Sequence, residues 1–144
     1  MMPHLSVGAL LGLSGRDRAN LEAMSALIGD GDAACDLVAG HMGVSLARRS
    51  GGSRWKFYER MASLPGDGER EGYAAQYVRR WWYGGKGSEY WWGFHKEDDG
   101  RLLYFGYWAF DVAACLLAWG LDDSPLLGAK HYPADLARLA RAGR

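Results

Sequence analysis

The stretch from residue 104 to residue 123, YFGYWAFDVAACLLAWGLDD, constrains the fold more than any other part of the chain. A single charged residue, Asp111, lies between its two glycines, Gly106 and Gly120. One stripe recurs at the spacing of successive helical turns: Trp108, Val112, Cys115 and Trp119. A helix that is apolar on nearly all sides belongs in the interior of a globule, and this one is shorter than the ~20 apolar residues that cross a bilayer. We therefore predict a buried central helix over about 106–119.

Breaks rich in glycine, serine, aspartate and proline divide the rest of the chain into further short helical segments. No stretch alternates long enough to predict a strand. The sequence therefore predicts an all-α bundle of six or seven short helices around the central helix, in one domain spanning residues 1–144. The expected segments are 14–28, 33–48, 54–63, 69–83, 106–119, a short helix after Asp123 and a last helix that starts at Pro133.

The spacing of large side chains also predicts which face of each helix is buried. Asp32 is expected to cap the helix over 33–48, which would bury Leu46. The last helix is expected to turn Leu136, Leu139 and Ala140 inward, and Arg138 and Arg141 outward. The core-facing residues predicted for the first helix are Leu21, Met24, Leu27 and Ile28.

Charge balance limits the classes of partner. The chain has 17 basic and 17 acidic residues, which argues against a generic nucleic-acid binder and against an acidic mimic of DNA. The apolar run near the N-terminus, in MMPHLSVGALLGLSG, follows no basic region, so no signal peptide is predicted and the cytoplasm is the expected compartment. We expect neither a nucleic-acid nor a membrane partner.

Residue types that bind metals or act as nucleophiles are sparse. Cys35 and Cys115 each lie in alanine-rich, helical surroundings and are expected to be buried thiols. The sequence contains no CxxC, HExxH, GxxxxGK[ST] or GxSxG motif. We therefore predict no metal site, no cofactor and no catalytic group.

An aromatic cluster near the middle of the chain favours a protein interface. It consists of Trp81, Trp82, Tyr83, Tyr90, Trp91 and Trp92. Two adjacent tryptophans cannot both point inward, so at least one of each pair should be partly exposed. Exposed aromatic side chains flanked by basic ones, here Arg79, Arg80 and Lys86, are typical of protein interfaces. The alternative is a thick local core that covers a long loop.

Two polar groups are open to a chemical interpretation. His95 precedes three carboxylates, Glu97, Asp98 and Asp99, which fits a general base or a loose cation site, although a solvated turn is the more usual structure. Asp111 lies among aromatic residues, where a carboxylate needs a partner. An arginine of helix 69–83 (Arg79 or Arg80) or a tyrosine hydroxyl could supply it. A small enzyme or ligand-binding domain, with an aromatic pocket around Asp111 and His95, therefore stays open as an alternative function.

Four segments of the C-terminal half resemble a known family. They are YVRRWWYGG (77–85), WWGFH (91–95), YFGYWAFDVAACLLAWGLDDSPL (104–126) and HYPADLAR (131–138). In this order and spacing they resemble the C-terminal domain of PoNi proteins, the immunity proteins paired with PoNe-type polymorphic DNase toxins of bacteria. The residues that carry the motif are Gly106, Tyr107, Trp108, Phe110, Asp111, Ala113, Ala114, Leu121, Asp122, Asp123, Ser124, Tyr132, Pro133, Asp135 and Leu136.

This resemblance implies a non-enzymatic inhibitor that binds a cognate secreted toxin and occludes its active site. Most of the motif is expected to be scaffold, with the contact made by exposed residues elsewhere. We predict that the following residues contact the toxin: Trp82, Glu89, Tyr90, Trp91, Trp92, Glu97, Asp98 and Asp99. The carboxylates would meet the basic rim of a DNase cleft, and the tryptophans would anchor the contact. A second possibility is that Arg79, Arg80 and Lys86 bind the acidic metal ligands of the nuclease.

Overall fold

The regular structure of the chain is helical, as predicted. The computed structural model describes residues 2–13, 15–27, 31–85 and 107–143, and no strand occurs among them. The α-helices are α1 (Met2–Leu11), α2 (Gly15–Leu27), α3 (Ala33–His41), α4 (Lys56–Ser63), α5 (Asp67–Gln76), α6 (Tyr83–Gly85), α7 (Phe110–Trp119) and α8 (Ala134–Ala142). A π-helical turn, η1 (Tyr77–Trp82), joins α5 to α6, and a 3-10 turn, η3 (Ser124–Leu126), follows α7. The all-α fold class is therefore confirmed.

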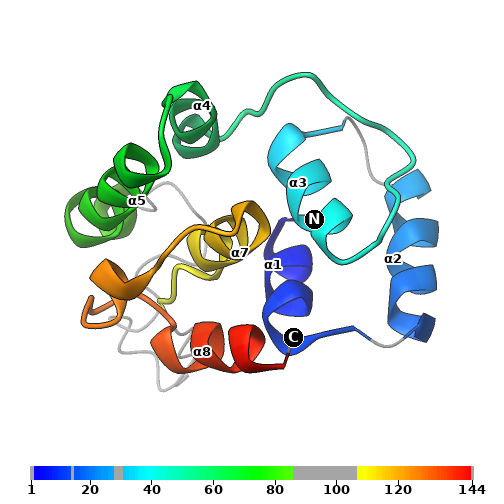
Figure 1. The fold of residues 1–144 in the computed structure, drawn as a ribbon. Helices are drawn as coiled ribbons and strands as arrows, with labels where there is room; N and C mark the ends of the chain where they lie inside the picture. The colour runs from blue at the N-terminus through cyan, green and yellow to red at the C-terminus, as the bar shows by residue number, and fades with distance from the viewer. Residues whose placement is uncertain (1, 14, 28–30, 86–106, 144) are drawn as a thin grey trace, which may run out of the picture.

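Helix α7 occupies the centre of the bundle (Figure 1). Helices α1, α3 and α8 pack against it, and α1 also packs against α3 and α8. Every residue from Val112 to Leu117 is buried. At its C-terminal end Gly120 adopts the left-handed conformation (φ 71°), which lets its N–H and that of Leu121 return to carbonyls of the last turn. The predicted central helix is thus confirmed, although it begins at Phe110 rather than near residue 106.

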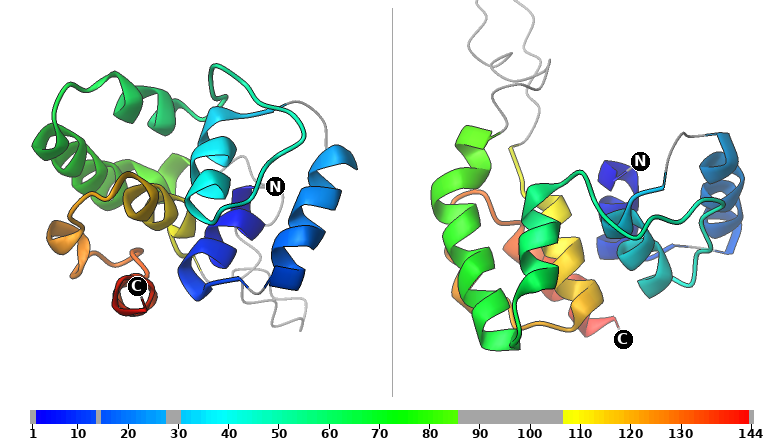
Figure 2. Two further views of the ribbon diagram at one scale, coloured as in Figure 1. Left: turned by 45° about the vertical axis from the view of Figure 1, so that its right-hand side comes forward. Right: turned by 90° about the horizontal axis from the view of Figure 1, so that it is seen from above.

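Aromatic side chains dominate the core on the side of α4, α5 and η1. Phe57 of α4 is fully buried, with its ring centroid 4.5 Å from that of Tyr77 and 5.8 Å from that of Tyr73. Trp55 packs on the other side of the same ring at 4.7 Å. The second view in Figure 2, seen from above, places α4 and α5 together on one side of α7 and the N-terminal helices on the other.

Small and aliphatic side chains fill the core on the side of α1 and α3. Leu5, Val38 and Cys115 are buried together there. Asp32 caps α3 as predicted, because its Oδ1 accepts a hydrogen bond from the Ala34 N–H at 2.9 Å. The helix ends at His41, however, because Gly43 takes a left-handed conformation (φ 70°). The prediction that this helix continues to residue 48 was therefore wrong, although Leu46 is half-buried against the same core.

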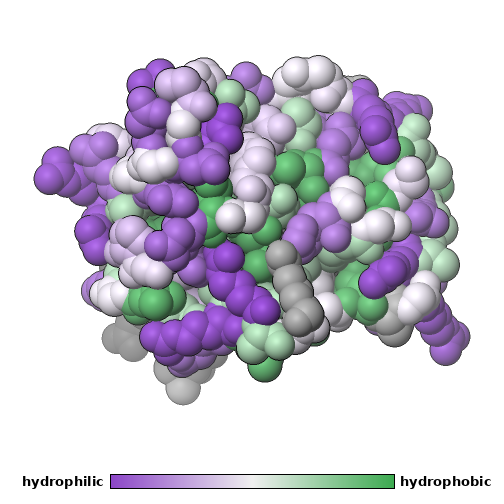
Figure 3. Space-filling model, viewed as in Figure 1, coloured by the Kyte–Doolittle hydropathy of each residue, from purple (hydrophilic) through white to green (hydrophobic). Residues whose placement is uncertain are grey.

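Helix α2 is attached to the body through polar contacts and through Leu21, which packs partly buried against the core. The buried Ser25 Oγ accepts a hydrogen bond from the Ala47 N–H at 2.9 Å, and Glu22 Oε1 accepts one from the Ser45 N–H at 3.0 Å. Leu21 is half-buried and packs against the core, as predicted, whereas Leu27 is 86% exposed and Met24 is also exposed, so the predicted apolar face was wrong for these two residues. Ile28 lies outside the described residues. Figure 3 shows hydrophobic surface on the side of the molecule where α2 lies.

The π-turn decides which of two adjacent tryptophans enters the core. Helices α5, η1 and α6 are continuous over residues 67–85, close to the predicted 69–83. In η1 the hydrogen bonds run from residue i to residue i+5, so each turn holds more residues than an α-helical turn. Trp82 joins Val78 in the core at 2% exposure, whereas Trp81 is 46% exposed. The expectation that one of the pair is exposed was right, but the exposed residue is Trp81.

Helix α8 packs only partly as predicted: Leu136 and Ala140 lie against the core, but Leu139 and Arg141 do not take their predicted positions. Ala137 is its buried residue, and Leu139 is exposed. Arg141 turns inward, where its Nη2 donates a hydrogen bond to the Leu121 carbonyl at 2.8 Å. A small alanine face lets the helix approach the core closely, and the buried carboxylate of Asp123 attracts the Arg141 guanidinium. The inward position of Leu139 and the outward position of Arg141 were therefore wrong.

Candidate partner-binding surface

Most of the residues predicted to contact a partner lie outside the described residues. These are Glu89, Tyr90, Trp91, Trp92, Glu97, Asp98 and Asp99. The same holds for Lys86, His95 and Gly106. Trp82 is the one member of the predicted contact set in the part of the chain that the structure describes, and it is buried. The burial of Trp82 therefore contradicts the prediction that this residue contacts a partner directly.

The residues that flank segment 86–106 are locked together at one end of the bundle. The rings of Tyr83 and Tyr107 meet edge to face with centroids 5.6 Å apart, and His131 stacks on Tyr83 at 4.7 Å. His131 Nδ1 lies 3.0 Å from the Tyr107 carbonyl oxygen, and the His131 carbonyl accepts a hydrogen bond from the Ala109 N–H at 2.8 Å. The residues that precede and follow segment 86–106, which carries most of the predicted contact residues, are thus held together at one place.

Asp111 is used inside the fold. Its Oδ1 accepts hydrogen bonds from the Trp82 indole Nε1–H at 3.2 Å and from the Val112 N–H at 2.9 Å. The carboxylate also lies in the first turn of α7, where it complements the positive end of the helix dipole. Sequence reasoning expected an arginine or a tyrosine hydroxyl as its partner, and the structure supplies the indole of Trp82.

The Asp122-Asp123-Ser124 part of the motif builds the turn after α7. Asp122 Oδ1 accepts hydrogen bonds from the Ser124 N–H at 3.0 Å and the Ser124 hydroxyl at 2.6 Å, and these bonds lower the pKa of the Asp122 carboxyl. Asp123 is the N-cap of η3, and its Oδ2 accepts a 2.6 Å hydrogen bond from the Tyr132 hydroxyl. The Arg141 Nε lies 3.1 Å from Asp123 Oδ1 as an ion pair.

Burial of Tyr132 has an electrostatic consequence. Removal from water raises the pKa of its phenol far above the usual range, and the hydrogen bond to the ionised Asp123 raises it further. The phenol therefore stays a hydrogen-bond donor at any physiological pH. This hydrogen bond joins Tyr132, which precedes Pro133 and α8, to Asp123 in the turn after α7. Tyr132 and Asp123 therefore hold α8 in place.

A shallow groove of about 500 Å³ opens between the start of α7 and the start of α8. Trp108, which is 43% exposed, and Phe110 lie on one side of it. Its other lining residues are Leu127, Gly128, Ala129, Lys130, Tyr132, Pro133, Ala134, Asp135, Leu136 and Arg138. Sequence reasoning placed Trp108 on the buried stripe, because it started the central helix too early. The groove adjoins Tyr107, where segment 86–106 ends.

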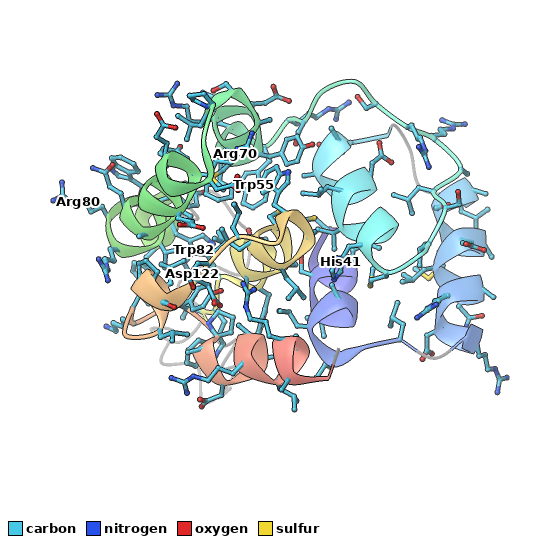
Figure 4. All side chains as sticks on the ribbon, viewed as in Figure 1. His41, Trp55, Arg70, Arg80, Trp82 and Asp122 are labelled. Carbon is cyan, nitrogen blue, oxygen red and sulfur yellow. The ribbon has the colours of Figure 1, made fainter. Side chains whose placement is uncertain are left out.

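The outer face of η1 presents a second exposed surface, made by Arg79, Arg80 and Trp81. The Arg79 Nη2 donates a hydrogen bond to the Pro125 carbonyl, which ties η1 to η3. The Trp81 ring lies 6.3 Å from that of Tyr73. Figure 4 shows the Arg80 side chain extending away from the ribbon. Sequence reasoning grouped the two arginines together and could not tell which one was engaged.

The described residues contain neither a metal-binding cluster nor a helix that could cross a membrane. No group of three or more histidine, cysteine or carboxylate side chains there is placed to bind a metal ion. Within the same residues, no helix has the length and apolar character that crossing a bilayer requires. Both cysteines are buried free thiols, and burial raises the pKa of Cys35 to about 11.

These features describe a helical scaffold in which Asp111, Asp122 and Asp123 accept hydrogen bonds within the fold. Two exposed tryptophans, Trp81 and Trp108, lie in its C-terminal half. The comparison with protein families gives the class. The family model for PoNe immunity proteins (PoNi), C-terminal, matches residues 36–136, and the chain belongs to this family. Searches of curated proteins and of solved structures found no match. The family match runs from α3 into α8, so α1 and α2 lie outside it.

Proposed function

We propose that this protein binds a cognate secreted bacterial toxin, a DNase of the PoNe type, and neutralises it by covering its active site. The family match over residues 36–136 carries the proposal. The toxin would act on DNA, so the proposed place of action is the cytoplasm of the cell that the protein protects.

Inhibition by occlusion requires a rigid scaffold and a complementary surface, and no catalytic group. Three motif carboxylates, Asp111, Asp122 and Asp123, already accept hydrogen bonds within the fold. This use supports a binding role over an enzymatic one, because a general base needs its lone pairs free for the substrate.

The proposed contact surface is the end of the bundle around Tyr83, Tyr107 and the groove at Trp108. Segment 86–106 starts and ends there, and Trp91 and Trp92 are its proposed anchors. The proposed electrostatic contacts are made by Glu89, Glu97, Asp98 and Asp99 with the basic rim of the nuclease. The groove would accept an apolar side chain of the toxin next to Trp108.

The test is a growth assay with the candidate toxin encoded next to this gene, expressed with and without this protein, followed by co-purification. Rescue of growth together with a stable complex is the expected result. Charge reversal at Glu97, Asp98 and Asp99 should weaken the complex, with reversal of Asp17 on α2 as the matched control. Failure of the wild-type chain both to rescue growth and to form a complex would contradict the proposed function.

A further inference from the structure

The two successive arginines of η1 have different surroundings. Arg79 is engaged, since its guanidinium donates to the Pro125 carbonyl of η3. Arg80 is exposed, and among the hydrogen bonds and ion pairs of the described residues it has no partner (Figure 4). An exposed guanidinium without an intramolecular acceptor is available to a carboxylate of another molecule.

Two acidic side chains of α5, the helix that precedes Arg80, are engaged within the fold. Asp67 of α5 pairs with Arg70 at 3.2 Å. Glu71 of α5 accepts a hydrogen bond from the Asp122 N–H at 2.8 Å, which links α5 to the turn after α7. The positive charge of Arg80 is therefore not neutralised by these carboxylates of the preceding helix.

Trp81 stands beside Arg80 and is held by a row of rings. Its ring contacts Tyr73 at 6.3 Å, and Tyr73 stacks on the buried Phe57 at 5.8 Å. The Trp81 indole is thus in contact with Tyr73 while nearly half of its surface remains exposed. A side chain held in this way loses little rotamer freedom on binding, which favours affinity.

We propose that Arg80 and Trp81 form a contact pair for the cognate toxin, in which Trp81 covers an apolar patch and Arg80 binds an adjacent carboxylate of the toxin. Arginine and tryptophan are the residue types most enriched among the strong contributors to protein interfaces. Arg79 is a positioning residue, which fixes η1 against η3 so that Arg80 and Trp81 face outward. The inference rests on the proposed function and adds a second contact region to it.

Affinity for the toxin encoded next to this gene tests the pair, with calorimetry as the readout. Arg80→Glu and Trp81→Ala should each weaken binding by about 30-fold or more, and Arg80→Lys should weaken it less. Arg16→Glu is the matched control. Arg16 is an exposed arginine of α2, a helix that lies on the opposite side of α7 from α5 in Figure 1, and its reversal should leave affinity within about twofold of wild type. Thermal unfolding should show that all four variants remain folded.

If the wild-type chain binds and Arg80→Glu binds equally well, the contact pair is wrong while the proposed function stands. If the wild-type chain does not bind, the proposed function itself fails, and the contact pair fails with it.

A crosslinking experiment supplies a positive readout that does not depend on loss of affinity. A carbodiimide joins a lysine amine to a carboxylate that it touches. In the complex, Arg80→Lys should yield a crosslinked peptide between position 80 and an aspartate or glutamate of the toxin, identified by mass spectrometry. Arg79→Lys, at the neighbouring engaged position, should yield none. A crosslink from position 79 and none from position 80 would overturn the assignment.

Discussion

Helix α2 and the helix formed by α5 and η1 look alike in sequence, because both carry apolar residues at helical spacing. Both lie on the surface of the bundle. They are held in different ways. The α5–η1 helix buries Ala74, Val78 and Trp82 against the body, whereas the buried residue of α2 is Ser25. Apolar spacing alone therefore does not predict burial. A second apolar surface must be available to cover the stripe, and in α2 the core covers Leu21 but leaves Met24 and Leu27 exposed.

The two helices also differ in whether the family match includes them. The α5–η1 helix lies inside residues 36–136 and carries the exposed pair Arg80 and Trp81, whereas α2 lies outside that range. Substitutions in the two helices should therefore have effects of different size on stability and on binding.

Replacing Trp82 by alanine should cost the most stability. The indole is buried and its N–H bonds to Asp111, so removal leaves a cavity and an acceptor with one donor fewer. We expect a loss of about 3–5 kcal/mol in the free energy of unfolding, measured by urea titration. The neighbouring Trp81→Ala should cost less than about 1 kcal/mol, because its side chain is half exposed. Equal costs for the two variants would contradict the register that the π-turn sets.

Replacing Tyr132 by phenylalanine should have the next largest effect. The hydroxyl donates a 2.6 Å hydrogen bond to Asp123 in a buried site, and its loss leaves that carboxylate with Arg141 as its remaining charged contact. The expected cost is about 1.5–3 kcal/mol, the range for a hydrogen bond to a charged group. Asp135→Asn is the control, since its ion pair with Arg138 is exposed and should contribute less than about 1 kcal/mol. A neutral Tyr132→Phe would show that the buried bond does not hold α8.

Stability should fall at alkaline pH. Burial raises the pKa values of Cys35, Cys115, Tyr58 and Tyr132 in the folded protein. The folded state therefore keeps protons that the unfolded chain releases, starting near the ordinary cysteine pKa of about 8.5 and continuing past the tyrosine pKa of about 10. The stabilisation from these groups is complete below about pH 8.5 and is lost progressively above it. Urea titrations at successive pH values measure this, and in Tyr132→Phe the decline above about pH 10 should be shallower.

The smallest change in the free energy of unfolding should come from the exposed apolar residues of α2. Leu27→Ala should change the free energy of unfolding by less than about 0.5 kcal/mol, because the side chain is almost fully exposed. Ser25→Ala in the same helix should cost about 1–3 kcal/mol, because it leaves the Ala47 N–H without its acceptor. If Leu27→Ala proves the more costly of the two, α2 packs by apolar contact and the comparison with α5–η1 is wrong.

Sequence reasoning predicted those parts of the fold that depend on local signals. The central helix, the cap at Asp32 and the turn at Asp123 and Pro125 each have a residue-level cause, and the structure shows all three. The parts that it missed depend on tertiary packing. The inward position of Arg141 follows from its attraction to the buried carboxylate of Asp123, which lies 18 residues away in sequence.

The candidate site was predictable to the level of a region but not of each residue. The doubled tryptophans indicated an exposed aromatic surface, yet only the wider turn of η1 decides that Trp81 is exposed and Trp82 is buried. The partner of Asp111 could not be read from spacing, because Trp82 and Arg79 both lie on the helix expected to supply it. The contacts predicted for Glu89 through Asp99 stay predictions.

The central claim is that this protein inhibits a DNase by binding it. The most direct measurement is a titration of the purified toxin, followed by its rate of DNA cleavage, with increasing amounts of this protein. We expect a linear loss of cleavage that is complete at one equivalent, together with a stable complex in size-exclusion chromatography. Cleavage that persists in excess protein would contradict it. Complete loss far below one equivalent would also contradict it, because that result requires an enzyme that inactivates the toxin.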